Sequence, residues 1–237
     1  MILADDIIAL LKEHGTPEKA KHLSYYFKTG EGTYGEGDLF IGVEVPVTRS
    51  ILSKYWKDID LSEIKKLTES EYHEARLVGF LLLLKKYEKS KDQMKKQECV
   101  DLYIHQADYL NNWDLVDLSC YKLLGAWLLD KDRSILYEFA RSGHLWRQRI
   151  AIVTCMCFIK QGDFKDCEAI ADLYLDHKED LIHKATGWML REVGKQDEAE
   201  LKRFLASRYR QMPRTMLRYA IEKFPPDIRS QYIKGEI

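Results

Sequence analysis

Hydrophobic residues recur along this chain at spacings of three and four, which is the pattern of helices that bury one face. The segment 4–14 shows it first, with Ile7 and Leu11 one helical turn apart. Thr16 and Pro17 then form a typical helix start, in which an N-cap residue is followed by proline at the first helical position. We expect this second helix to run to about residue 28.

The same pattern continues from residue 46 almost to the end of the chain. Pro213 begins the last predicted segment, and Pro225 and Pro226 end it. The predicted helices span residues 46–57, 62–69, 71–87, 92–109, 113–129, 131–142, 146–160, 164–176, 180–194, 197–210 and 213–224. No stretch alternates between apolar and polar residues as a half-buried strand does, so the chain is predicted to be all-α.

The order of these helices predicts an architecture as well as a class. Antiparallel helix pairs that repeat at about 35–45 residues are typical of HEAT and armadillo solenoids. We therefore expect a single HEAT-like repeat domain over residues 1–237, an α-solenoid (α-α superhelix) whose concave face carries the function. A globular helical bundle is the alternative that the same pattern allows.

Residues 29–46 form the one stretch without helical periodicity. Five of the thirteen glycines lie here. No Gly-Lys-Ser/Thr follows them, and their spacing differs from that of a dinucleotide-binding turn. The segment is therefore predicted to be a long structured connection.

The chain is almost neutral overall, and its positive charge is concentrated near the C-terminal end of the sequence. Lys and Arg number 37 and Asp and Glu number 38, so the net charge of −1 argues against a protein that coats nucleic acid with its whole surface. Residues 181–237 nevertheless hold 12 basic and 7 acidic side chains. This part of the chain can present a local anion-binding face.

Several classes of protein are disfavoured by what the chain lacks. Its longest apolar run, residues 78–84, is far shorter than the roughly 20 residues of a membrane span, and no basic signal segment begins the chain. The five cysteines lie in apolar helical patterns, and Cys155 and Cys157 are spaced wrongly for a zinc knuckle. We expect a cytoplasmic protein with reduced thiols, a monomer that needs no metal and no cofactor.

Trp113 and Asp117 stand out on the predicted helix 113–129. Val116 and Cys120 belong to its core stripe, whereas Trp113 and Asp117 share a different stripe at a spacing of four. An aromatic ring one turn from a carboxylate is a candidate site. The alternative is a tryptophan that packs on a neighbouring helix and a carboxylate that caps or pairs locally.

A second tryptophan lies among cations on the predicted helix 180–194. Lys184, Trp188, Arg191 and Lys195 follow one another at spacings of four, three and four. This pattern suits a nucleic-acid backbone, because the ring packs on sugar or base and the cations meet phosphates. A solvated basic face with Trp188 wedged between helices is the alternative.

Arg149 enters an almost wholly apolar helix at the edge of its core. An arginine in that position is usually paired or bound to an anion, because an unpaired buried charge is costly. Both an internal salt bridge and a bound anion fit this pattern.

Taken together, these residues resemble the AlkD-type DNA alkylation repair family. The resemblance covers nearly the whole chain and keeps the order of the motifs. It is carried by Pro17-Glu18-Lys19-Ala20, Tyr25-Tyr26-Phe27, Phe40-Ile41-Gly42-Val43, Trp113-Asp114-Leu115-Val116-Asp117, Trp146-Arg147-Gln148-Arg149 and Gly187-Trp188-Met189-Leu190-Arg191-Glu192.

The resemblance implies a HEAT-like solenoid that grips duplex DNA and excises cationic N3- and N7-alkylpurines without flipping the base. It implies that Trp113 and Trp188 pack against the deoxyribose of the lesion and that Asp117 is the catalytic carboxylate. It also implies that Arg149 holds the phosphate backbone and that Tyr26 lies near the duplex at the lesion.

Two other functions stay open at this stage. A non-catalytic HEAT-like protein that binds damaged or branched DNA needs only the basic face, which comprises Lys184, Arg191, Lys195, Arg214 and Arg218. A protein-binding scaffold needs no basic face at all, and the near-neutral net charge allows it.

Overall fold

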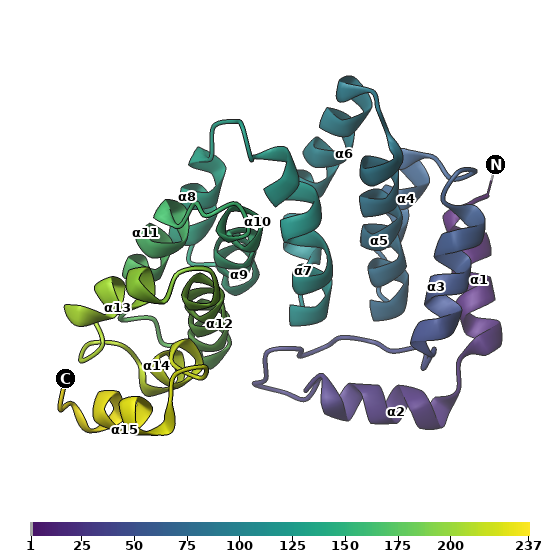
Figure 1. Ribbon diagram of the computed structural model, residues 1–237. Coiled ribbons are helices and arrows are strands. Elements are labelled where there is room, and N and C mark those ends of the chain that lie inside the picture. Colours follow the sequence, from purple (N-terminus) through teal and green to yellow (C-terminus); the bar gives the residue numbers. More distant parts are fainter. Residues whose placement is uncertain (1) are drawn as a thin grey trace. The chain divides into compact units, whose positions relative to one another are not determined.

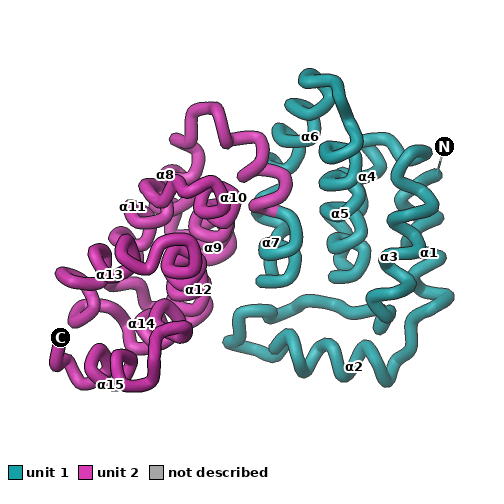
Figure 2. The backbone as a smooth tube through the Cα atoms, in the orientation of Figure 1, with its two compact units in different colours: residues 1–119 teal, residues 120–237 magenta. Residues whose placement is uncertain are grey.

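A computed structural model describes residues 2–237, and it confirms that the chain is all-α. No β-strand occurs in these residues, and an isolated parallel bridge joins Leu39 to Tyr72. The helices divide into two compact units, the first ending at Ser119 and the second beginning at Cys120 (Figure 2).

The first unit holds the helices up to α7, of which the last residue, Cys120, belongs to the second unit. They are α1 (Ala4–His14), α2 (Pro17–Tyr26), α3 (Val45–Tyr55), α4 (Leu61–Thr68), α5 (His73–Lys89), α6 (Gln93–His105), the 3₁₀ helix η1 (Ala107–Tyr109) and α7 (Trp113–Cys120). The second unit continues with the π-helical turn η2 (Tyr121–Gly125), α8 (Ser134–Arg141), α9 (Leu145–Thr154), α10 (Met156–Ile159), α11 (Lys165–Leu173), α12 (Asp180–Gln196), α13 (Glu198–Ala206), α14 (Arg214–Ala220) and α15 (Pro226–Lys234).

Helix α5 is the centre of the first unit, where it packs against α1, α3, α4 and α6. Its Val78, Phe80 and Leu83 are completely buried. Gly79 lies against α4 so closely that a Cβ atom there would come within 2.9 Å of the Thr68 side chain. The glycine therefore allows two helices of this unit to approach without a gap between them.

The glycine-rich segment is a structured connection, as predicted. α2 crosses the lower ends of α3, α5 and α7 in Figure 1, and the connection returns between α2 and these ends. Helix α2 ends at Tyr26, slightly earlier than predicted, and Lys28 adopts a left-handed φ of 54°. At Gly42, φ is 87° and a Cβ atom would lie 2.2 Å from the Thr16 carbonyl oxygen, so this position requires glycine.

Helix α12 has the central place in the second unit, where it packs against α9, α11, α13 and α14. Its contact with α14 is very close at Gly187. A Cβ atom there would come within 2.5 Å of both the Met216 carbonyl oxygen and the Tyr219 Cβ atom. The residue before Trp188 is thus determined by helix packing.

Among the differences from the predicted helices, two are breaks within a helix and one is an additional helix. The helix expected over 113–129 changes at Cys120 into the π-helical turn η2, where Gly125 lies close to the Thr154 carbonyl oxygen. The helix expected over 146–160 breaks at Cys155 into α9 and α10. Helix α15 is additional to the predicted helices: Pro225 and Pro226 predict a helix end, whereas Pro226 is also the first residue of α15.

All five cysteines are free thiols, and four of them are buried. No helix within residues 2–237 has both the length and the apolar character needed to cross a bilayer.

Candidate functional site

The first turn of α7 presents Trp113. The side-chain oxygen of the fully buried Asn112 accepts a hydrogen bond from the Trp113 backbone N–H at 2.9 Å. The Asp114 carboxylate accepts one from the Leu115 N–H, also at 2.9 Å. These bonds satisfy amide groups that are otherwise unpaired at a helix start, so they hold the first turn in which Trp113 lies.

The indole of Trp113 belongs to an aromatic cluster that joins α7 to the end of α2. It stacks on Phe27 with a centroid separation of 5.4 Å and meets Tyr26 edge-on at 6.2 Å. Phe27 is buried, whereas Tyr26 is 56% exposed. Trp113 itself is half-buried, so one part of the ring is supported by Phe27 and another part reaches solvent.

Asp117 lies one helical turn after Trp113 on α7, and it is also half-buried. The structure thus brings together Trp113 and Tyr26, two of the predicted site residues, with Asp117 on the same stripe of α7 as Trp113. These three residues belong to the first unit.

A buried histidine lies behind this cluster. His73, at the start of α5, is bound through Nδ1 to Asp38 at 2.8 Å and through Nε2 to Asp114 at 2.9 Å. Burial disfavours its charged form, but the hydrogen bonds and charges of the two carboxylates outweigh burial and raise the pKa of His73 to about 9. The imidazole is therefore protonated at neutral pH.

The two carboxylates of this cluster differ in their other partners. Asp38 is also paired with Arg76. Burial by itself raises the pKa of Asp38, but the hydrogen bond from His73 and the charge of Arg76 hold it below its usual value. Asp38 thus stays ionised inside the protein, paired with two cations.

Glu74 holds the other end of the glycine-rich connection. Its carboxylate accepts hydrogen bonds from the backbone N–H groups of Ile41, Gly42 and Val43 at 2.9, 2.8 and 3.2 Å. His73 and Glu74 together therefore attach the connection to the first turn of α5. The sequence pattern gives no signal for the roles of His73 and Glu74, because their partners lie more than 30 residues away along the chain.

Trp188 lies on α12 in the second unit and is half-buried. Two of the cations around it pair with carboxylates about one turn away on the same helix. Lys184 pairs with Asp180 at 2.7 Å and Lys195 pairs with Glu192 at 2.6 Å.

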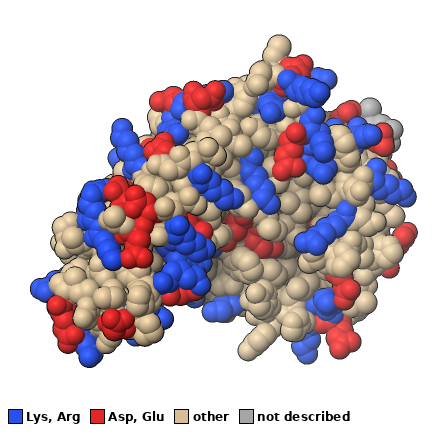
Figure 3. Space-filling view, in the orientation of Figure 1, with Lys and Arg blue, Asp and Glu red and all other residues tan. Residues whose placement is uncertain are grey.

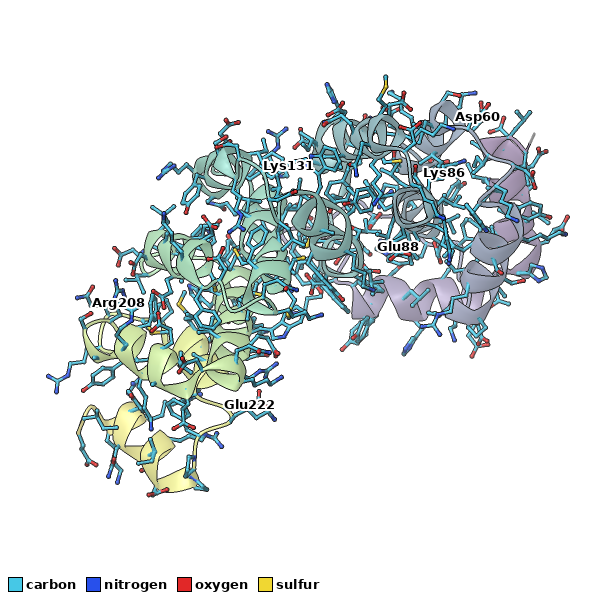
Figure 4. The ribbon with its side chains drawn as sticks, turned by 45° about the horizontal axis from the view of Figure 1, so that its top comes forward. Asp60, Lys86, Glu88, Lys131, Arg208 and Glu222 are labelled. Carbon is cyan, nitrogen blue, oxygen red and sulfur yellow. The ribbon has the colours of Figure 1, made fainter. Side chains whose placement is uncertain are left out.

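Arg191 pairs with Glu222, which follows α14 and is labelled in Figure 4. In the left part of Figure 3, Lys and Arg side chains lie next to Asp and Glu side chains. The three cations around Trp188, which are Lys184, Arg191 and Lys195, are thus each paired with a carboxylate. These carboxylates reduce the net positive charge around Trp188.

Arg149 is 6% exposed on α9 and donates a hydrogen bond to the Leu181 carbonyl oxygen at 2.7 Å. This bond ties α9 to the first turn of α12. A contact between Arg149 and a phosphate remains a prediction.

The last two predicted cations lie on α14. Arg214 donates to the Ile233 carbonyl oxygen of α15 at 2.5 Å. Arg218 lines a groove of about 410 Å³ whose other lining residues are Ile221, Pro226, Arg229, Ser230 and Ile233. No acidic side chain is among these lining residues, so the groove is positively charged.

Within residues 2–237, no group of three or more His, Cys, Asp or Glu side chains has the arrangement of a metal site.

Comparisons with known proteins agree with this all-α fold. A solved structure, described as a predicted DNA alkylation repair enzyme from Enterococcus faecalis, superposes with a TM-score of 0.71 over 90% of this chain and 98% of that chain, at 18% identity. No curated protein sequence matches significantly. Residues 7–224 match the model of the DNA alkylation repair enzyme family. The chain therefore belongs to the DNA alkylation repair enzyme family.

Proposed function

We propose that this protein is a DNA glycosylase that excises cationic N3- and N7-alkylated purines from duplex DNA without base flipping. The observation that carries the proposal is the Trp113 and Asp117 stripe of α7, with Tyr26 beside Trp113, in a member of this family. Family membership supports damaged DNA as the substrate, and the stripe supports hydrolysis of the N-glycosidic bond.

The chemistry needs only one carboxylate. An alkylated purine already carries a positive charge, so it leaves as a neutral base when the bond from C1′ to nitrogen breaks and both electrons go to nitrogen. Ordinary glycosidases also need an acid, because their leaving oxygen must be protonated. In this proposal, Asp117 stabilises the oxocarbenium-like sugar, orients the attacking water and accepts its proton.

The two tryptophans act on the same developing cation. Trp113 and Trp188 pack their rings against the deoxyribose of the lesion, where the negative face of an indole stabilises positive charge. Contact with the sugar, without a pocket for the base, tolerates alkyl groups of different sizes. Stacking on Phe27 limits the motion of the Trp113 ring and so supports this role.

The rest of the proposed site is a DNA-binding surface. The helices are proposed to form one HEAT-like repeat domain over residues 1–237 that holds the duplex on its concave face. Phosphates are proposed to contact Arg149, Lys184, Arg191, Lys195, Arg214 and Arg218, and Tyr26 to lie near the duplex. These contacts position the protein but read no sequence.

The direct test is incubation of the protein with duplex DNA that contains one 7-methylguanine, followed by measurement of the free base. We expect release by the unaltered protein and a large loss of rate in Asp117→Asn. Asp130→Asn is the matched control, since Asp130 has a side chain that is 83% exposed. Full activity of Asp117→Asn contradicts the role of the carboxylate. Tight, salt-dependent binding without release contradicts the enzyme and leaves a non-catalytic DNA-binding protein.

A further inference from the structure

His73 joins three segments of the first unit. It lies at the start of α5, and its two ring nitrogens contact Asp38 in the glycine-rich connection and Asp114 in the first turn of α7. The side chains of His73 and Asp38 are 2% and 1% exposed, so water contributes little to this junction. The proposed reaction uses none of these groups directly.

The same imidazole is packed between aromatic rings. Phe40 stacks on it at a centroid distance of 4.5 Å, and Phe27 lies against it at 5.0 Å. Phe27 in turn stacks on Trp113. His73 therefore contacts both parts of the structure that hold the Trp113 indole. These are the first turn of α7, which it reaches through Asp114, and the ring of Phe27.

We propose that the protonated His73 is a positioning residue, which holds Asp38 and Asp114 together and thereby sets the orientation of Trp113. The effect on excision rests on the proposed function, whereas the coupling between His73 and Trp113 does not. The glycine-rich connection then contributes to the site, because it carries Asp38, one of the two carboxylates that His73 binds.

The hydrogen bonds explain why the charge is required. Only the imidazolium form has a donor on both ring nitrogens, and two carboxylates can only accept. Deprotonation leaves one carboxylate facing a lone pair at less than 3 Å. Arg76 still pairs with Asp38 in that state, so we expect the Asp114 side of the junction, and with it Trp113, to move.

The coupling is measured directly by fluorine NMR. The protein is labelled with 5-fluorotryptophan, and the Trp113 signal is assigned with Trp113→Phe. Across pH 6 to 10 we expect the Trp113 signal to shift with the midpoint of the His73 titration, which is recorded on the imidazole nitrogens of the same unaltered protein. A Trp113 signal that ignores the titration of His73 overturns the proposal, and this measurement needs no variant of His73.

Variants then separate positioning from a general effect on folding. In His73→Gln we expect the pH-dependent shift of Trp113 to vanish, and the single-turnover excision rate at pH 7 to fall about tenfold, as for the loss of a charged hydrogen bond. His22→Gln on α2 is the matched control, because His22 is exposed. If His73→Gln does not fold, the pH titration of the Trp113 signal in the unaltered protein still tests whether His73 sets the orientation of Trp113.

The two proposals fail in different ways. Absence of base release by the unaltered protein contradicts the glycosylase but leaves the fluorine titration as a valid test of His73. Normal excision by a folded His73→Gln, with a Trp113 signal that still shifts, contradicts the positioning role and leaves the glycosylase intact.

Discussion

The ring of Phe27 lies parallel to the indole of Trp113 within 27°, at a centroid separation of 5.4 Å. Phe27 is the residue directly after α2, and Trp113 is the first residue of α7. Phe27, which is distant from Trp113 in the sequence, thus supports one face of the tryptophan that is proposed to contact the sugar.

Replacement of Phe27 tests whether its ring supports the Trp113 indole. Phe27→Ala is expected to reduce the free energy of unfolding by about 3–5 kcal/mol, because a buried ring is lost and a cavity remains. Phe27→Leu fills most of the volume and is expected to cost about 1 kcal/mol, yet still to lower the excision rate, because no ring supports the indole. Urea denaturation and single-turnover excision measure the two effects. Equal excision by Phe27→Leu and the unaltered protein contradicts the expectation.

Gly187 tests the close contact between α12 and α14. Gly187→Ala places a methyl group within 2.5 Å of the Met216 carbonyl oxygen, so we expect a loss of about 1–3 kcal/mol in the free energy of unfolding. Gly30→Ala is the control, because nothing lies within 4 Å of the added atom and the backbone is not in the left-handed region. Denaturation curves that coincide for the two variants rule out the close contact.

The charge of His73 predicts how stability depends on pH. Its pKa of about 9 in the folded protein exceeds the ordinary value of 6.5. The stabilisation is therefore complete below pH 6.5 and is lost as pH rises through 9, with an upper limit of about 3 kcal/mol. The free energy of unfolding is measured at pH 6, 8 and 10 for the unaltered protein and for His73→Gln. The difference between the two is expected to shrink as pH rises, and a constant difference contradicts the charged junction.

Lys195 and Arg218, two of the predicted DNA-binding cations, are expected to contribute differently to the affinity for duplex DNA. Lys195 is paired with Glu192, whereas Arg218 lines a groove with Arg229 and no acidic side chain. We expect Arg218→Ala to weaken duplex binding and to lower the slope of log affinity against log salt by about one, as for one lost phosphate contact. Lys195→Ala is expected to change both quantities less. Fluorescence anisotropy at several salt concentrations measures them, and a larger effect of Lys195→Ala reverses the assignment.

Local patterns were enough to predict most of the helices. The helix over residues 4–14 and the N-cap at Thr16 agree with the structure, since the Thr16 hydroxyl accepts a hydrogen bond from the Lys19 N–H. Such features depend on residues within about one helical turn. Helix α15 was missed because two adjacent prolines can both end one helix and begin the next.

By itself, the sequence determined the helical class, the family motifs and the stripe that carries Trp113 and Asp117. Only the tertiary structure decided what surrounds them. His73 meets Asp38 and Asp114 across 35 and 41 residues, and Arg191 meets Glu222 across 31. Helical periodicity is a short-range property of the backbone, whereas the pairing of distant charges exists only after the helices pack, so no spacing along the chain could predict it.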